Sequence, residues 1–134
     1  MKKTQSLRIM TRTGYIDMSG KKDSNQCANI GHPLYEYTAR VLFHPDALLN
    51  ERGFLIDHFD IDIATKVAVA DSGSCEIMCK KILDSIESIL KQKTTPYMGV
   101  KFTLKPVGVD PKDSGYFEEF RVSHQKYSAL VMSL

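Results

Sequence analysis

The sequence lacks any apolar segment that could cross a bilayer or act as a secretion signal. A membrane-spanning helix needs about 20 consecutive apolar residues. A signal peptide needs an apolar region directly after its basic start. None of the apolar runs in the 134 residues approaches the first length, and no apolar region follows the basic start Met1-Lys2-Lys3. We therefore expect no membrane partner and a cytoplasmic location.

Cysteine is scarce, and the familiar cysteine-based motifs are absent. Cys27, Cys75 and Cys79 are the three cysteines of the chain. They cannot all pair with one another, and none lies in a CxxC spacing. Reduced thiols fit a reducing compartment. The sequence also has no P-loop, no GxSxG and no zinc-ribbon spacing, which argues against the enzyme and zinc classes that those motifs mark.

Charge of one sign is not in excess either. The formal net charge is +2, and lysine and arginine are spread along the chain. A nucleic-acid-binding protein needs a clustered basic face, so we expect no nucleic-acid partner. The length of 134 residues, with 43% hydrophobic and 25% charged residues, is typical of one globular domain. The expected domain covers residues 1–134.

Alternation of apolar and polar residues, together with residue composition, predicts four strands. The clearest alternation occupies residues 35–44, where every second residue from Tyr35 is apolar and Pro45 ends the pattern. The other strands are expected at 7–16, 98–105 and 116–124. The tail at 125–134 is expected to form a fifth short strand or a subunit contact.

The strongest periodicity in the sequence predicts a helix at residues 74–91. Apolar residues recur there at three- and four-residue spacing, and charged residues occupy the other side. A shorter helix is favoured at 61–70, although the β-branched residues of this segment also permit a strand. The resulting order β-β-α-α-β-β predicts an α+β fold, with a four-stranded antiparallel sheet and two helices packed on one of its faces. Polar residues on the other face favour a homo-oligomer.

The long loop before the second strand contains the first candidate site. A loop of this length in a small domain is usually functional or mobile. Cys27 and His32 lie five residues apart in it, so Cys27 could act as a nucleophile or proton donor with His32 as its partner. The alternative, an ordinary loop thiol and an exposed histidine, stays open.

An acidic cluster with one histidine follows the short apolar run Phe54-Leu55-Ile56. Asp57, His58, Asp60 and Asp62 could bind a divalent metal. Their spacing matches no specific metal loop. Asp60 or Asp62 could equally be the N-cap of the following helix.

Other candidate residues lie on the long helix and the last strand. Cys75 and Cys79 are one turn apart and could bind a metal, but their position on the apolar face favours core packing. Glu76 stabilises the helix start or contacts a ligand. Glu118 and Glu119 could anchor a ring edge with two N–H donors, although a solvated strand face is the favoured interpretation.

Four segments resemble the tunnelling-fold family of 6-pyruvoyl-tetrahydropterin and 6-carboxytetrahydropterin synthases, over roughly residues 5–124. The segment CANIGH at 27–32 is similar to a catalytic cysteine and a His-Gly-His zinc motif that lead into a strand. The segment GFLIDHF at 53–59 resembles the family's Gly-Met-Val-x-Asp-Phe. The segment Ser74-Cys75-Glu76 is similar to Thr-Ser-Glu-Asn at the helix start, and Pro96 precedes the third strand as in the family.

This resemblance implies a homo-oligomer, built as a trimer-based barrel, with a pterin or purine-like heterocycle bound between subunits. It assigns catalysis to Cys27 and His32, and ligand binding to Asp57, Ser74 and Glu76.

The zinc site of the family is incomplete in this chain. The family uses three histidine ligands, but only the second histidine of the pair remains, as His32, and the first strand has none. One ligand cannot hold a catalytic zinc, so zinc would require His58 and Asp57 to complete the set with His32. The family's anchoring glutamate is also missing, since Leu104-Lys105 stands near its place.

The sequence therefore predicts a divergent 6-pyruvoyl-tetrahydropterin synthase-like protein with a degenerate zinc site. If it is an enzyme, a lyase of that kind is expected. Two alternatives stay open. One is a non-catalytic oligomeric scaffold or binding module, and the other is a metal-free enzyme that uses Cys27.

Overall fold

The computed structural model describes the strands, the helices and the C-terminal segment of this chain. The described residues are 7–17, 34–45, 47, 56–70, 75–93, 95–108 and 116–134, and only the backbone is described for 67–70 and 75. Two strands come first, then two helices, then two strands and a short C-terminal helix.

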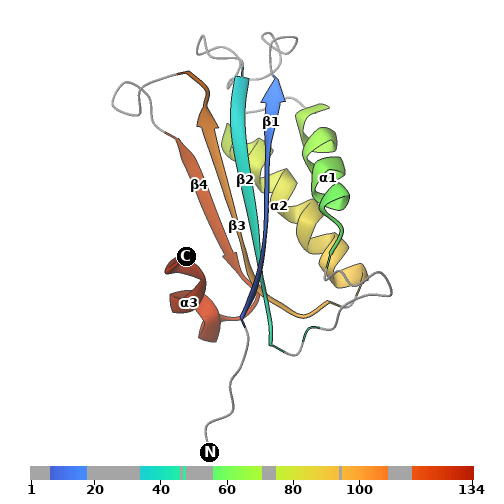
Figure 1. Cartoon of the computed structure of the whole chain (residues 1–134), viewed down its shortest axis with the longest axis vertical. Coiled ribbons are helices and arrows are strands. Elements are labelled where there is room, and N and C mark those ends of the chain that lie inside the picture. Colours follow the sequence, from blue (N-terminus) through green and yellow to red (C-terminus); the bar gives the residue numbers. More distant parts are fainter. Residues whose placement is uncertain are drawn as a thin grey trace, which may run out of the picture.

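The strands form one antiparallel sheet in the order β1-β2-β3-β4 (Figure 1). All four strands were predicted from the sequence, with ends that shift by one or two residues. The central pair joins distant parts of the chain, since Ala39 of β2 lies opposite Phe102 of β3. The bounds are Arg8–Asp17 for β1, Leu34–Phe43 for β2, Tyr97–Pro106 for β3 and Phe117–Val122 for β4.

Two helices, α1 (His58–Ala70) and α2 (Cys75–Gln92), cover one face of the sheet, as predicted (Figure 1). They run antiparallel, so the start of α1 lies beside the end of α2. There, Lys93 donates a hydrogen bond to Asp60 over 2.7 Å. α1 begins earlier than predicted, at His58 rather than Ile61. Among the described helices, none is long and apolar enough to span a membrane.

The main core lies between the sheet and these helices. Every second residue of β2 from Tyr35 to Phe43 is buried, as its alternation predicted. Val100, Phe102 and Leu104 extend this apolar face onto β3. The stripe of α2 that packs in the same cluster consists of Met78, Cys79, Ile82, Leu83, Ile86 and Leu90.

The prediction of a fifth strand at the C-terminus is wrong. The segment forms a 3₁₀ turn, η2 (Gln125–Tyr127), and a short helix, α3 (Ser128–Met132). Its apolar residues Tyr127, Val131 and Leu134 recur at helical spacing, and they pack in a second cluster with Leu42 and Met98. α3 therefore lies over one end of the sheet face opposite to α1 and α2.

Gly14 of β1 lies so close to the Tyr37 ring that the position requires glycine. A Cβ there would be 2.5 Å from the Tyr37 hydroxyl oxygen. The ring is held in place, because it stacks on Phe102 with centroids 5.8 Å apart and donates a hydrogen bond to Asp62. We expect Gly14→Ala to lower the free energy of unfolding by about 1–3 kcal/mol, measured by urea denaturation.

Thr13→Ala is the matched control, because Thr13 is the exposed neighbour of Gly14 on the same strand. Its effect should stay within about 0.5 kcal/mol. A Gly14→Ala protein as stable as the wild type would contradict the close packing.

Candidate functional site

The predicted site residues fall into two groups. Asp57, His58 and Glu76 are described by the structure. Cys27, His32 and Ser74 lie outside the described residues, so their place in a common site stays a prediction.

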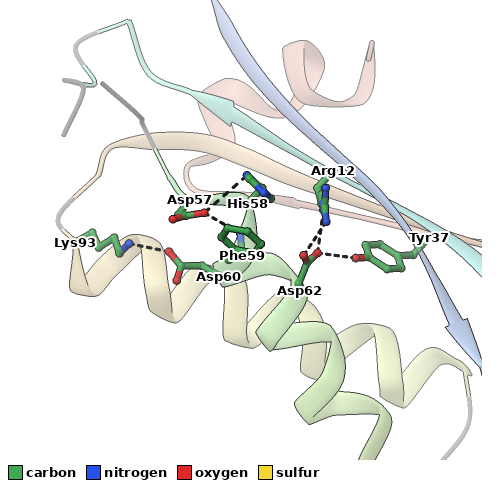
Figure 2. A network of polar contacts seen from close by, with 8 residues as sticks. All are labelled: Arg12, Tyr37, Asp57, His58, Phe59, Asp60, Asp62 and Lys93. Carbon is green, nitrogen blue, oxygen red and sulfur yellow. Dashed lines mark hydrogen bonds and ion pairs between the residues drawn. The ribbon is translucent and has the colours of Figure 1, made fainter. Parts of the chain in front are cut away.

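Asp57 and His58 lie at the start of α1, where Asp57 caps the helix (Figure 2). The Asp57 carboxylate accepts a hydrogen bond from the Phe59 N–H over 3.0 Å, and its carbonyl accepts one from the Asp60 N–H over 3.0 Å. Asp57, rather than Asp60 or Asp62, is thus the N-cap. His58 Nδ1 lies 3.8 Å from the same carboxylate, and about half of the His58 side chain stays exposed.

The other two carboxylates of the acidic cluster are engaged with separate partners (Figure 2). Asp60 pairs with Lys93 at the end of α2. Asp62 accepts hydrogen bonds from Arg12 Nη2 over 2.7 Å, from Arg12 Nε over 2.9 Å and from the Tyr37 hydroxyl over 3.0 Å. Asp60 thus ties α1 to α2, and Asp62 ties it to β1 and β2.

A zinc ion does not fit the donors that the structure describes here. A catalytic zinc needs three protein ligands. Within the described ranges, no three histidine, cysteine, aspartate or glutamate side chains lie close enough together to hold a metal. The three aspartates instead serve as a cap and as two separate ion pairs. A ligand set that joins His58 to His32 stays a prediction.

Glu76 lies in the first turn of α2 and is exposed. A negative charge is favourable there because of the helix dipole. The start of α2 lies at the end of the molecule where β1 ends and β2 begins (Figure 1). Asp57 lies at the opposite end of the helical layer, since the 13 residues of α1 span about 20 Å. One chain by itself therefore does not bring Asp57 and Glu76 together.

Cys79 is a core residue, as its place on the apolar face of the helix indicated. It is fully buried. Burial raises the pKa of its thiol to about 12, helped by the negative charges of Glu119 and Glu76. The thiol thus stays protonated near neutral pH and is a poor nucleophile or metal ligand. The Cys75 side chain lies outside the described part of the chain.

Glu118 and Glu119 face opposite sides of β4. Glu118 lies on the face without α1 and α2, where it forms an ion pair with Lys101 over 3.0 Å and accepts a hydrogen bond from the Thr103 hydroxyl over 3.3 Å. Glu119 lies on the helical side, 3.9 Å from Arg121 Nε. Its Oε2 atom is buried, with no hydrogen-bond partner within the described ranges. Both carboxylates thus have ion-pair partners inside the fold.

The open face of the sheet, which is the face without α1 and α2, has a polar pocket of about 180 Å³. This pocket was not predicted from the sequence. The alternation had indicated a polar face, but it could not give the register between β2 and β3. That register places Arg40 opposite Lys101, and Thr38 opposite Thr103. The lining residues are Glu36, Thr38, Arg40, Lys101, Thr103, Lys105, Tyr116 and Glu118.

The contacts of Asp62 predict how the stability of the fold depends on pH. The hydrogen bonds from Arg12 lower the pKa of Asp62 below its ordinary value of 3.8. A carboxyl with a lowered folded-state pKa contributes stability that is present above its unfolded-state pKa and is lost as the pH falls through its folded-state pKa. We expect Asp62→Asn to be less stable than the wild type at neutral pH, with a difference that shrinks below about pH 4.

Urea denaturation of both proteins from neutral to acidic pH measures this difference. Asp60→Asn is the control, because its partner Lys93 is more exposed, and we expect a smaller effect. A difference between Asp62→Asn and the wild type that is the same at every pH would contradict the ionised pairing.

Comparison with known proteins gives a structural relative and no sequence relative. Neither a protein-family model nor a curated protein sequence matches this chain. The fold is similar to the crystal structure of dihydroneopterin aldolase from Burkholderia thailendensis bound to guanine, with a TM-score of 0.58. The similarity covers 88% of this chain and 93% of the aldolase chain, at 14% sequence identity.

This similarity confirms the predicted α+β architecture. At 14% sequence identity it shows the fold alone, and it does not single out the 6-pyruvoyl-tetrahydropterin synthases. The chain therefore shares the fold of this aldolase across most of its length.

Proposed function

We propose that this chain binds a pterin or purine-like heterocycle at a site between the subunits of a homo-oligomer. The observation that carries the proposal is the fold match to a dihydroneopterin aldolase crystallised with guanine, which extends over 88% of this chain. Pterins and guanine share a ring edge with adjacent N–H donors, so one site chemistry can recognise either.

Glu76 is the described residue best suited to recognise that edge. An ionised carboxylate has two acceptor oxygens and can pair with two neighbouring N–H donors, as it does with arginine. Glu76 is exposed in the first turn of α2. The chain that follows β1 and precedes β2 starts and ends at the same end of the molecule, and that segment contains Cys27 and His32. These positions support a ligand site at this end.

The subunit interface in the proposal rests on two features. β1 and β4 are the outer strands of the described sheet, so each has one edge without a neighbouring strand among the described residues. Open edges favour pairing with another chain unless they are covered. In addition, Asp57 and Glu76 lie at opposite ends of the helical layer. A site that uses both requires Asp57 from one subunit and Glu76 from another.

The catalytic part of the proposal is a lyase activity on this heterocycle. It would resemble the activity of the 6-pyruvoyl-tetrahydropterin synthases. The described donors do not support the zinc of that family. Proton transfer would therefore fall to Cys27 and His32, which matches the metal-free alternative. A binding module without activity is the other alternative.

Replacing the Glu76 carboxylate should weaken binding of guanine. We expect the wild type to bind guanine in a calorimetric titration, and Glu76→Gln to bind it about 10-fold or more weakly, because a hydrogen bond to a charged group contributes about 1.5–3 kcal/mol. Asp84→Asn is the matched control. It makes the same charge change on the same helix, and Arg121 keeps its pairing with Glu87.

Equal affinities of the Glu76→Gln and Asp84→Asn proteins would remove Glu76 from the site, and a wild type that does not bind guanine would overturn the proposal. Light scattering on the same samples reports the mass. A monomer that binds guanine would contradict the intersubunit part alone.

The reactivity of Cys27 separates the catalytic forms of the proposal from the binding module. A nucleophilic or proton-donating cysteine has a lowered pKa, so Cys27 should react with iodoacetamide on the order of 10-fold faster than a free thiol at neutral pH. Mass spectrometry of the labelled peptides assigns the rates, with the buried Cys79 as an internal slow reference. Uniformly slow labelling would exclude the Cys27-dependent enzyme.

A further inference from the structure

The pocket lies on the open face of the sheet, whereas Glu76 of the proposed heterocycle site lies on α2, which covers the other face. The pocket is formed by side chains of β2 and β3, together with Tyr116 and Glu118. The residues of β2 and β3 that face the helices are apolar, whereas those that line the pocket are all polar or charged. Polar and charged groups are thus concentrated on one part of the sheet.

Positive charge exceeds negative charge in the pocket. Arg40, Lys101 and Lys105 face two carboxylates, Glu36 and Glu118. The two carboxylates are not placed alike. Glu118 pairs with Lys101 over 3.0 Å, and Glu36 stands in the register opposite Lys105. The part of the pocket around Arg40 is therefore its most positive part.

Arg40 is half-buried, and within the described ranges it has no carboxylate partner. Across the part of the chain that the structure describes, no hydrogen bond or ion pair to its guanidinium is found. Its cross-strand neighbour on β3 is Lys101, which carries a charge of the same sign on the same face. Like charges directly opposite each other are unfavourable in a sheet. Solvent exposure by itself therefore gives no favourable reason for an arginine opposite Lys101.

The donors around Arg40 are suited to an oxyanion. The guanidinium presents five N–H donors in a planar fork that matches a phosphate or carboxylate. Lys101 donates a hydrogen bond to the Leu134 carbonyl and forms an ion pair with Glu118, and an ammonium has three N–H donors, so it can still donate to an anion. Thr38 lies two residues before Arg40 on the same face of β2, opposite Thr103, and adds a hydroxyl.

We propose that Arg40, Lys101 and Thr38 form a binding site for a phosphoryl group, either free phosphate or the phosphate of a larger ligand. A phosphate dianion offers several acceptor oxygens to this set of donors, and its charge relieves the repulsion between Arg40 and Lys101. The site does not depend on the proposed heterocycle site, because it shares no residue with it.

Calorimetric titration with inorganic phosphate tests the site on the full chain in chloride buffer. We expect the wild type to bind phosphate and Arg40→Gln to bind it on the order of 10-fold more weakly. Arg40→Lys keeps the charge but loses the planar fork, so an intermediate affinity is expected. Lys66→Gln on the exposed side of α1 is the control for net charge.

Thr38→Val keeps the test decisive if the arginine variants do not fold, since it removes one hydroxyl and keeps the branched shape. It should weaken phosphate binding by a smaller factor than Arg40→Gln. Methyl phosphate separates the two sources of the group. Affinity equal to that of phosphate indicates the end of a larger ligand, and much weaker binding indicates the free ion. No phosphate binding by the wild type, or equal losses in Arg40→Gln and Lys66→Gln, would overturn the site.

Discussion

The burial of the apolar stripe of α2 against β2 and β3 is the constraint on which the rest of the described structure depends. Ile82, Leu83, Ile86 and Leu90 are fully buried in one cluster with alternate residues of the two central strands. Side chains alternate strictly along a strand. Once one set of β2 residues contacts the helix, the intervening residues must face the other way. The packing on the helical face therefore directs the intervening residues of β2 and β3, most of them polar, to the open face.

α1 is held in place by polar contacts as well as by apolar ones. Ile61 and Ala64 are buried in the core. Asp60 and Asp62 bind Lys93 and Arg12 on neighbouring elements. The cluster of aspartates therefore positions α1, and its carboxylates point to different partners instead of converging on one ion. A dense run of acidic residues can thus be a set of separate structural contacts.

The two proposed sites lie on chemically different surfaces of the fold. One is the end of the molecule at the start of α2, where the exposed Glu76 can meet a ring edge with paired N–H donors. The other is the open face, where Arg40 and Lys101 stand side by side across two strands. A carboxylate selects donors, and a guanidinium with an ammonium selects anions. The two surfaces therefore call for different ligand groups, and the sheet that separates them keeps their charges apart.

The sequence by itself determined the four strands, the long helix α2, their order, and the buried faces of β2 and α2. Periods of two and of three to four residues are local properties of strands and helices, so residues 35–44 and 74–91 already carried that information. It could not place the α1 cap, because Asp57, Asp60 and Asp62 are all capable N-caps. It also misread the C-terminal segment, whose Val131 packs on Gly99 of a distant strand. The tertiary structure decided the pairings. It brought Arg40 opposite Lys101, joined Asp62 to Arg12 across 50 residues of chain, and separated Asp57 from Glu76. Register and helix direction depend on contacts between residues far apart in the chain, which local spacing does not encode.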